Sequence, residues 1–536
     1  MTASTAIPKV PTKAYLVGGG IASLSAAVYL IRHAKMNPHD ITIFENLPVT
    51  GGSMDATGNH KKGYLMRGGR MFDEEAYTCL FDLLSEIPSK HHPGKTCKEV
   101  IFEFSARVPT DAHARLIEEG CVKADAARLG VSVVDSARFG ELLVLPEDAI
   151  QGRGIDEYFT EAFFESNFWF CMRSTFAFQP WHSLIEFKRY CLRFMHEVPK
   201  LFNLGGVWRS PFNQYDSIIA PVTAWLVEQG IVIQLDTEVT SLDFEVTERE
   251  RSVYKIHLKQ AGAAQEIPVS KTDLVFTTLG SLTAASSIGD DSHPAPAVLQ
   301  QKAEQDPTWT LWGDIAKRQP DFGRPAVFSS NIAASQFLSF SVTLRGDAFM
   351  RRYIAWSGNQ PGTGALVTFK HSKWGMSIVV PHQPHFANQP EDVSVFWGYG
   401  LFPDEVGNFV GKPMRECSGR EIMQEVMHML AFDEGMEEIL DSSYTIPAML
   451  PYTMAQFVKR SKGDRPEVVP AKAVNFAFLG QFVEHPDDVV FTVEYSVRCA
   501  QIAVYKLCSL DRAVTPMYKG WRDPTVVISA IKAMLH

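Results

Sequence analysis

The sequence predicts an α/β fold whose nucleotide-binding domain is assembled from segments that lie far apart in the chain. Residues 13–34 read as a buried strand, a glycine turn and a helix with apolar residues at helical spacing. A second strand, loop and helix begin at Asn475. The 536 residues are too many for one compact core. We therefore expect an α/β protein of about two or three domains, the first of them discontinuous.

The composition and the net charge exclude some classes of binding partner. Apolar residues make up 46% of the chain and charged residues 21%, as in ordinary globular proteins. The formal net charge of -10 argues against a nucleic-acid partner, because phosphate-binding surfaces carry a basic excess. The eight cysteines form no C-x-x-C pair, so neither a disulfide framework nor a metal site is indicated, and we expect a reducing cytoplasm. No uncharged apolar run reaches the ~18 residues of a membrane span.

The first glycine turn has the features of a dinucleotide site. Gly18 and Gly20 permit a tight turn and let a pyrophosphate approach the N-terminus of the helix that Ile21 and Ala22 open. The next strand, 41–46, carries Glu45, which is placed to accept the ribose hydroxyls. This pattern alone does not separate NAD from FAD.

The next segment favours FAD. A second glycine pair, Gly51 and Gly52, followed by Ser53, comes soon after the ribose-binding strand, although an ordinary turn is the alternative. The segment "RGGR", 67–70, then lets the backbone pass close to a flavin. Its arginines, Arg67 and Arg70, flank Gly68 and Gly69 and could neutralise a phosphate or a reduced flavin, with a structural role for one of them as the alternative.

Distant segments complete the expected cofactor site. The backbone of Val239, in the expected strand pair 231–244, could meet the adenine, and the chain crosses again at "LVFTTLGS", which ends in Gly280 and Ser281. The C-terminal strand could return beside the first strand and bring N–H groups near the isoalloxazine ring. Its expected contact residues are Gly480, Phe491, Thr492, Val493 and Ser496.

With these pieces in place, the chain resembles the oleate hydratases, FAD-dependent fatty acid hydratases also called myosin-cross-reactive antigens. The resemblance runs from about Tyr15 to the C-terminus. Its blocks are "GGSMDATG", "GYLMRGGRMFDEEAYTCLFDLLSEIPS", "ESNFWFCMRSTFAFQPWHS", "FNQYDSI", "QPHFANQPEDVSVFWGYGLFPD" and "GQFVEHPDDVVFTVEYSVR". The family adds water across the cis-9 double bond of an unsaturated long-chain fatty acid, turning oleate into 10-hydroxystearate without consuming FAD.

The resemblance also implies a division of the chain. It implies a glutathione-reductase-type FAD domain, a substrate domain containing β-strands, and a helical region. We expect the FAD domain in three parts (12–110, 206–290 and 471–536), a helical substrate-side region (111–205), a substrate domain (291–420) and a helical segment (421–470).

Hydration of an isolated alkene needs a proton donor, a group that polarises water and a dry pocket. Tyr190 shares a helix face with Phe187 and Phe194, which alone favours a core tyrosine. The resemblance instead implies that it is the proton donor. The family's water-activating glutamate is replaced by Met71. Either a carboxylate of the following run (Asp73, Glu74 or Glu75) reaches the water, or the flavin edge and backbone carbonyls suffice, or this branch runs the reaction differently. The simpler interpretation of the run is a solvated charge cluster.

The fatty-acid carboxylate would be bound, by the same resemblance, by Gln214 and His385. A threonine and an asparagine of the family are replaced by Val379 and Pro381, which donate no side-chain hydrogen bond. His382 is a candidate substitute. From the sequence alone, either histidine reads more simply as a loop residue.

Two other functions remain open, because FAD is expected and the glutamate is absent. The protein could be a flavoenzyme that oxidises, reduces or isomerises an unsaturated lipid, or a lipid-binding flavoprotein without activity. We expect a monomer, or at most a weak dimer, because the tail before the first strand is short. The final helix, "VVISAIKAMLH", either rests on a membrane interface or packs on the body.

Overall fold

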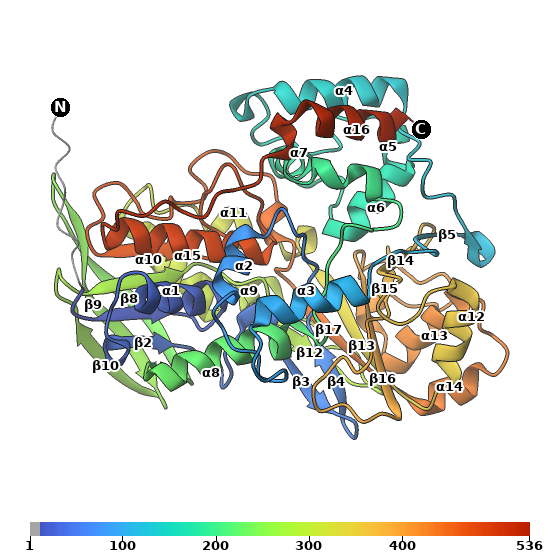
Figure 1. Cartoon of the computed structure of the whole chain (residues 1–536), viewed down its shortest axis with the longest axis horizontal. Coiled ribbons are helices and arrows are strands. Elements are labelled where there is room, and N and C mark those ends of the chain that lie inside the picture. Colours follow the sequence, from blue (N-terminus) through green and yellow to red (C-terminus); the bar gives the residue numbers. More distant parts are fainter. Residues whose placement is uncertain (1–10, 536) are drawn as a thin grey trace.

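The structure is a computed structural model that describes residues 11–535. It has three regions: a cofactor-binding region, a region built on a large mixed sheet, and a helical group above the junction between them (Figure 1). The short N-terminal tail lies mostly outside the described residues.

A five-stranded parallel sheet forms the centre of the cofactor-binding region. Its strand order is β18-β11-β1-β2-β7. The strands are β1 (Ala14–Val17), β2 (Ile41–Phe44), β7 (Val232–Gln234), β11 (Leu274–Thr278) and β18 (Phe476–Leu479). β1, the central strand, is buried along its whole length, and so is β18, although it lies at the edge of the sheet. Strands drawn from both ends and the middle of the chain share this sheet, which confirms the predicted discontinuity.

The position of the C-terminal strand differs from the expectation. β18 pairs with β11 and does not lie beside β1. Both edges of β1 are already occupied, by β11 on one side and by β2 on the other. The helix that follows β18 nevertheless returns to the first motif, because α15 (Val493–Leu507) packs against α1 (Ile21–Arg32).

A three-stranded antiparallel sheet adjoins the parallel one. It contains β8 (Thr237–Val246), β9 (Arg251–Gln260) and β10 (Ala263–Pro268), and α10 (Pro307–Arg318) packs on β8. The strands expected as a pair at 231–244 both exist, but β7 joins the parallel sheet and β8 joins this one. The chain therefore changes sheets at Leu235 and Asp236, just before Val239.

The second region is an eight-stranded mixed sheet of order β12-β17-β13-β16-β15-β14-β5-β6. The strands are β5 (Leu116–Glu118), β6 (Val122–Lys123), β12 (Ser287–Ile288), β13 (Phe337–Arg345), β14 (Leu366–Phe369), β15 (Ser377–Val379), β16 (Val393–Gly400) and β17 (Ser443–Leu450). Segment 421–470 was expected to be helical, but it includes β17, which pairs along its whole length with β13.

Helices cover the sheets. Those of the second region are α12 (Ala348–Ser357), α13 (Gly419–Met429) and α14 (Met436–Ser442); α2 (Thr78–Leu84), α3 (Cys97–Arg107), α8 (Ala220–Gln229), α9 (Gln300–Glu304) and α11 (Ala326–Ser329) lie elsewhere. A hairpin of β3 (Ala56–Asn59) and β4 (Gly63–Met66) packs on β13, where Met66 N–H donates to Ser341 Oγ at 3.1 Å. The RGGR segment directly follows β4, so this contact places it at the junction of the two regions.

The helical group contains α4 (Val133–Val144), α5 (Glu161–Phe164), α6 (Asn167–Phe176), α7 (Leu184–Arg193) and the C-terminal α16 (Pro524–Leu535) (Figure 1). α16 packs on the 3-10 turn Met195–Lys200 that follows α7 and buries Ala530 and Met534. Its residues Ile528 and Ile531 remain 52% and 46% exposed. Over residues 11–535, none of the helices combines the length and the apolarity needed to cross a bilayer.

Candidate functional site

A cavity of about 350 Å³ opens along the carboxyl ends of β1, β2 and β11. Almost all the residues expected to hold a cofactor line it. They are Gly18, Gly20, Ile21, Ala22, Glu45, Gly51, Gly52, Ser53, Arg67, Arg70, Val239, Gly280, Ser281, Gly480, Phe491, Thr492, Val493 and Ser496. Gly68 and Gly69 lie instead in the wall of a second cavity. We call the first one the cofactor cavity.

The glycine turn has the geometry that a pyrophosphate needs. Gly18 has a φ of +94°, in the left-handed region, and a Cβ there would lie 3.3 Å from the Thr278 side chain. Gly20 is the N-cap of α1 and offers no side-chain cap, so the N–H groups of the first turn are left for a ligand. Dinucleotide-binding turns commonly have a third glycine where this chain has Ser23. Ser23 is fully buried, with its Oγ 3.3 Å from Thr278 Oγ1.

The carboxylate of Glu45 lies beside this turn. It accepts N–H groups from Gly19 at 2.6 Å and from Leu47 at 2.9 Å. Burial raises the pKa of Glu45, and the two N–H groups oppose that shift. Each carboxylate oxygen keeps a further lone pair, so Glu45 can still accept ribose hydroxyls.

The two arginines of the RGGR segment differ in their partners. Arg67 is paired with Asp55 at 2.6 Å and also donates to Ser286 Oγ at 3.1 Å. Arg70 donates to the Ser53 carbonyl at 3.1 Å, and no carboxylate within residues 11–535 lies at ion-pair distance from it. Burial lowers the pKa of Arg70 to about 10, which still leaves it charged at neutral pH. Arg70 is therefore the arginine whose charge is free to meet an anion.

A second cavity, of about 130 Å³, adjoins the first and shares Arg67, Arg70, Phe491 and Thr492 with it. We call it the chamber. Its wall includes Met71, Asp73 and Tyr190, together with apolar side chains such as Phe176, Phe194, Phe337, Leu366 and Trp397. Gly69 must lack a side chain here, because a Cβ would lie 2.5 Å from the Trp397 ring. Glu74 and Glu75 are exposed and do not line the chamber.

Tyr190 is 1% exposed and its ring is surrounded by aromatic side chains. Its hydroxyl donates to the backbone carbonyl of Val490 at 2.5 Å. Burial raises the pKa of Tyr190 well above its usual value, and nearby acidic groups add to the shift. The phenol is therefore neutral over the physiological range and holds its proton at the chamber wall.

A small polar cavity touches the chamber through Gly69, Arg70 and Trp397. Its wall contains Gln214, His382 and His385, the residues expected to bind a carboxylate, and also Pro381. Gln214 uses its amide N–H to hold the Gly68 carbonyl at 3.0 Å. Burial lowers the pKa of His385 to about 3, so its ring is neutral, and its Nε2 is buried without a partner. Val379 lies in β15 and is not part of this wall.

The relation to known proteins agrees with this geometry. The model of the MCRA family matches residues 11–505. The chain belongs to the MCRA family. The oleate hydratase of Streptococcus pyogenes is 36% identical over 528 residues, covering 96% of this chain and 88% of that protein. The linoleate hydratase of Lactiplantibacillus plantarum is 32% identical over 567 residues, covering 98% and 99%. The family predicted from the sequence blocks is confirmed.

A solved structure also supports the fold of this MCRA protein. Cyclohexylamine oxidase from Brevibacterium oxydans superposes with a TM-score of 0.50 at 11% identity, covering 94% of this chain and all of that one. At this identity the likeness concerns the fold alone. It confirms the predicted α/β architecture with a Rossmann-like domain.

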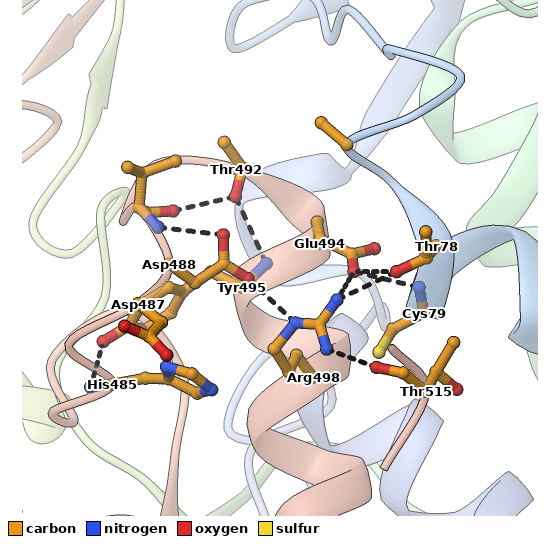
Figure 2. A network of polar contacts seen from close by, with 12 residues as sticks. Thr78, Cys79, His485, Asp487, Asp488, Thr492, Glu494, Tyr495, Arg498 and Thr515 are labelled. Atoms are coloured by element: carbon orange, nitrogen blue, oxygen red, sulfur yellow. Dashed lines mark hydrogen bonds and ion pairs between the residues drawn. The ribbon is translucent and has the colours of Figure 1, made fainter. Parts of the chain in front are cut away.

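In this MCRA chain an ionic network fixes the loop that ends in Phe491. Asp488 accepts from Arg193 Nε at 3.2 Å and from Arg498 Nε at 3.0 Å. Figure 2 shows Arg498 between Asp488 and Glu494, with Thr78 and Thr515 beside it. Arg193 belongs to α7, as Tyr190 does, and Asp488 lies two residues before Val490. The network therefore fixes the position of the Tyr190 phenol relative to its acceptor, the Val490 carbonyl.

Sequence reasoning missed Arg209, which lies in the wall of the polar cavity. Its guanidinium has no ion pair or hydrogen bond within residues 11–535, and Nη2 is buried. Burial lowers the pKa of Arg209 to about 10, with neighbouring Tyr353 acting in the opposite direction. The only signal in the sequence was a basic residue three positions before the FNQYDSI block.

Proposed function

We propose that this protein adds water across the cis-9 double bond of unsaturated long-chain fatty acids, converting oleate to 10-hydroxystearate, with FAD in the cofactor cavity. The observation that carries the proposal is the order of the three cavities. A cofactor cavity, an apolar chamber with a phenol in its wall and a cationic polar cavity share lining residues in that order. The 36% and 32% identities to an oleate and a linoleate hydratase support it.

The residues of the cofactor cavity fit FAD. The glycine turn and the open first turn of α1 suit a pyrophosphate, and Glu45 suits a ribose. A second helix, α15, begins at the same cavity with Thr492 as its N-cap. When bound, FAD would supply an isoalloxazine ring, which carries negative charge in its reduced anionic form. Arg70, without a carboxylate partner, would balance negative charge on that ring.

The chamber provides the two features that hydration needs, a proton donor and a wall that excludes bulk water. Tyr190 would give its proton to one alkene carbon while water attacks the other and loses a proton to the protein. The apolar wall, with Phe176, Phe194 and Phe337, keeps out bulk water that would compete for the proton. Because Tyr190 holds its proton on the Val490 carbonyl, the hydroxyl must turn toward the substrate before transfer.

The polar cavity would bind the fatty-acid carboxylate. Arg209 supplies the positive charge there, and His382 and His385 each have a buried ring nitrogen without a partner. A neutral His385 can donate one hydrogen bond but no charge. The charged guanidinium of Arg209 therefore takes over the anchoring that Pro381, in the same wall, cannot provide.

The replacement at Met71 favours one alternative, a flavoenzyme that isomerises or oxidises the same lipids. Incubating purified, FAD-loaded protein with oleate separates the two. Our proposal expects a product heavier by one water molecule, with no consumption of a reductant or of oxygen. An isomer of unchanged mass, or a product that appears only in step with electron transfer, would support the alternative. Binding of oleate without any product would indicate a lipid-binding protein.

The remaining proposals concern the state of the protein in the cell. We propose that it is cytoplasmic and monomeric, or at most weakly dimeric. The half-exposed Ile528 and Ile531 of α16 are compatible with a passing contact with membrane lipid, from which the substrate would be collected.

A further inference from the structure

The proposed hydration requires a group that takes a proton from the attacking water, and Met71 cannot do so. Among the residues that line the chamber, Asp73 and Glu197 are the carboxylates. Both lie on the same side of the chamber. The 3-10 turn Met195–Lys200 places Glu197 and His196 next to Asp73, in the segment that follows Met71. His196 Nε2 is 3.0 Å from Asp73 and 3.7 Å from Glu197.

The two carboxylates differ in the number of hydrogen bonds that their oxygens already accept. Asp73 is 5% exposed, and both of its oxygens accept hydrogen bonds from His196. One of them also accepts the N–H of Ala76 at 2.6 Å. Taking a proton on Asp73 would break this arrangement at the start of the segment leading to α2. We therefore assign Asp73 a structural role, in which it fixes His196 and the backbone at Ala76.

Glu197 has one oxygen engaged and one free. Its Oε1 accepts from Lys200 Nζ at 3.1 Å, whereas Oε2 accepts no hydrogen bond within residues 11–535. Oε2 lies against Gly206, where a Cβ would come within 1.6 Å of it. The backbone at Gly206 thus leaves room for this carboxylate and limits its movement.

We infer that Glu197 is the base that activates water in this protein, with Oε2 as the accepting atom. The inference rests on the proposed hydration. The Tyr190 O–H bond breaks and a C–H bond forms, while water forms the C–O bond and gives its second proton to Glu197. After product release that proton returns through solvent to the Tyr190 oxygen. The sum is alkene plus water, and no oxidant or reductant is needed.

The charges around Glu197 suit this role. Burial and the neighbouring Asp73 raise the pKa of Glu197, while Lys200 and His196 oppose the rise. A raised pKa makes the carboxylate a better proton acceptor. Glu75 is the remaining acidic neighbour of His196, at 3.7 Å. A metal ion in this group of side chains is disfavoured by the Lys200 ammonium, which already pairs with Glu197.

The first test is the substitution Glu197→Gln in the FAD-loaded enzyme. Glutamine keeps the shape of the side chain that packs against Gly206 and removes the base. We expect kcat for oleate to fall by about 100-fold or more, with KM, flavin content and Tm close to wild type. Glu161→Gln, the same change at an exposed position of α5, is the matched control and should leave kcat unchanged. Glu197→Gln with more than half of wild-type kcat would overturn the inference. Absence of hydration by the wild-type enzyme would instead refute the proposed function.

The pH profile of kcat provides a test that a merely structural role would not pass. The base acts when deprotonated, so activity falls on the acid side. Lys200→Met removes a positive charge, raises the pKa of Glu197 and should shift the acid limb to higher pH. Asp73→Asn removes a negative charge and should shift it to lower pH. Opposite shifts support Glu197 as the base, and the same acid limb in both variants overturns it.

Discussion

The Tyr190 hydroxyl donates to the backbone carbonyl of Val490 across 2.5 Å, at the boundary between the chamber and the cofactor cavity. Val490 belongs to the loop between β18 and α15 and precedes Phe491, which lines both cavities. The phenol on α7 is thus coupled to the C-terminal part of the cofactor-binding region. Asp488 stabilises this coupling through Arg193 and Arg498 (Figure 2).

Tyr190→Phe should abolish most of the hydration. The change deletes one proton and nearly preserves volume, so we expect kcat to fall by about 100-fold or more. The unpaired Val490 carbonyl should lower the free energy of unfolding by about 1–3 kcal/mol. Product formation and bound flavin should be measured on the same sample. Unchanged hydration with full flavin content would exclude Tyr190 as the acid.

Gly18→Val should abolish FAD binding. The residue has a φ of +94°, which valine rarely adopts, and its Cβ would meet Thr278 at 3.3 Å, in the turn expected to hold the pyrophosphate. Gly94→Val is a matched control, because Gly94 also has a positive φ, +83°, but has no neighbour within 4 Å of its Cβ position and lies outside the cofactor cavity. The flavin absorbance per protein should be lost only in the first variant. A normal flavin content in Gly18→Val would contradict the site.

Arg209→Met should weaken substrate binding while leaving the chemical step largely intact. Methionine keeps most of the apolar stem and removes the charge, so KM for oleate should rise by about tenfold or more, with a smaller effect on kcat. The rise should be much smaller for the methyl ester of oleate, which carries no charge. An equal KM for both substrates in wild type, or no change of KM in the variant, would show that Arg209 is not the anchor.

Met71→Glu should not improve the enzyme. If Glu197 already serves as the base, a second carboxylate near it in the chamber adds a desolvated negative charge, and kcat should stay equal or fall. The measurement is kcat for oleate at equal flavin occupancy. A gain of tenfold or more, about 1.4 kcal/mol of barrier, would show that the position simply lacks its carboxylate.

The sequence predicted the local units of the fold well and their arrangement less well. Helical and strand periodicity located α1, α15, β1 and β2 because each is a continuous segment with a distinct pattern. The separation of β18 from β1 by β11 depends on strand order, which no local pattern encodes. β17 was missed because its pairing with β13 joins residues about 100 positions apart, which no local pattern shows.

The candidate site divides in the same way. The expected cofactor residues lie around one cavity because glycine turns and helix starts are visible as motifs. Arg209 and Glu197 were not predicted. An unpaired guanidinium and a free carboxylate oxygen are defined by the absence of tertiary partners, and only the folded chain shows which charged groups lack them.

The most direct test of the proposed hydration is turnover of oleate by the purified, FAD-loaded protein in water enriched in oxygen-18. The reaction is run under anaerobic conditions, and the flavin spectrum is followed throughout. If the protein is a hydratase, we expect 10-hydroxystearate that carries the heavy oxygen, formed over many turnovers without lasting oxidation or reduction of the flavin. A product without the label, or one formed only in proportion to electrons consumed, would contradict hydration as the function of this protein.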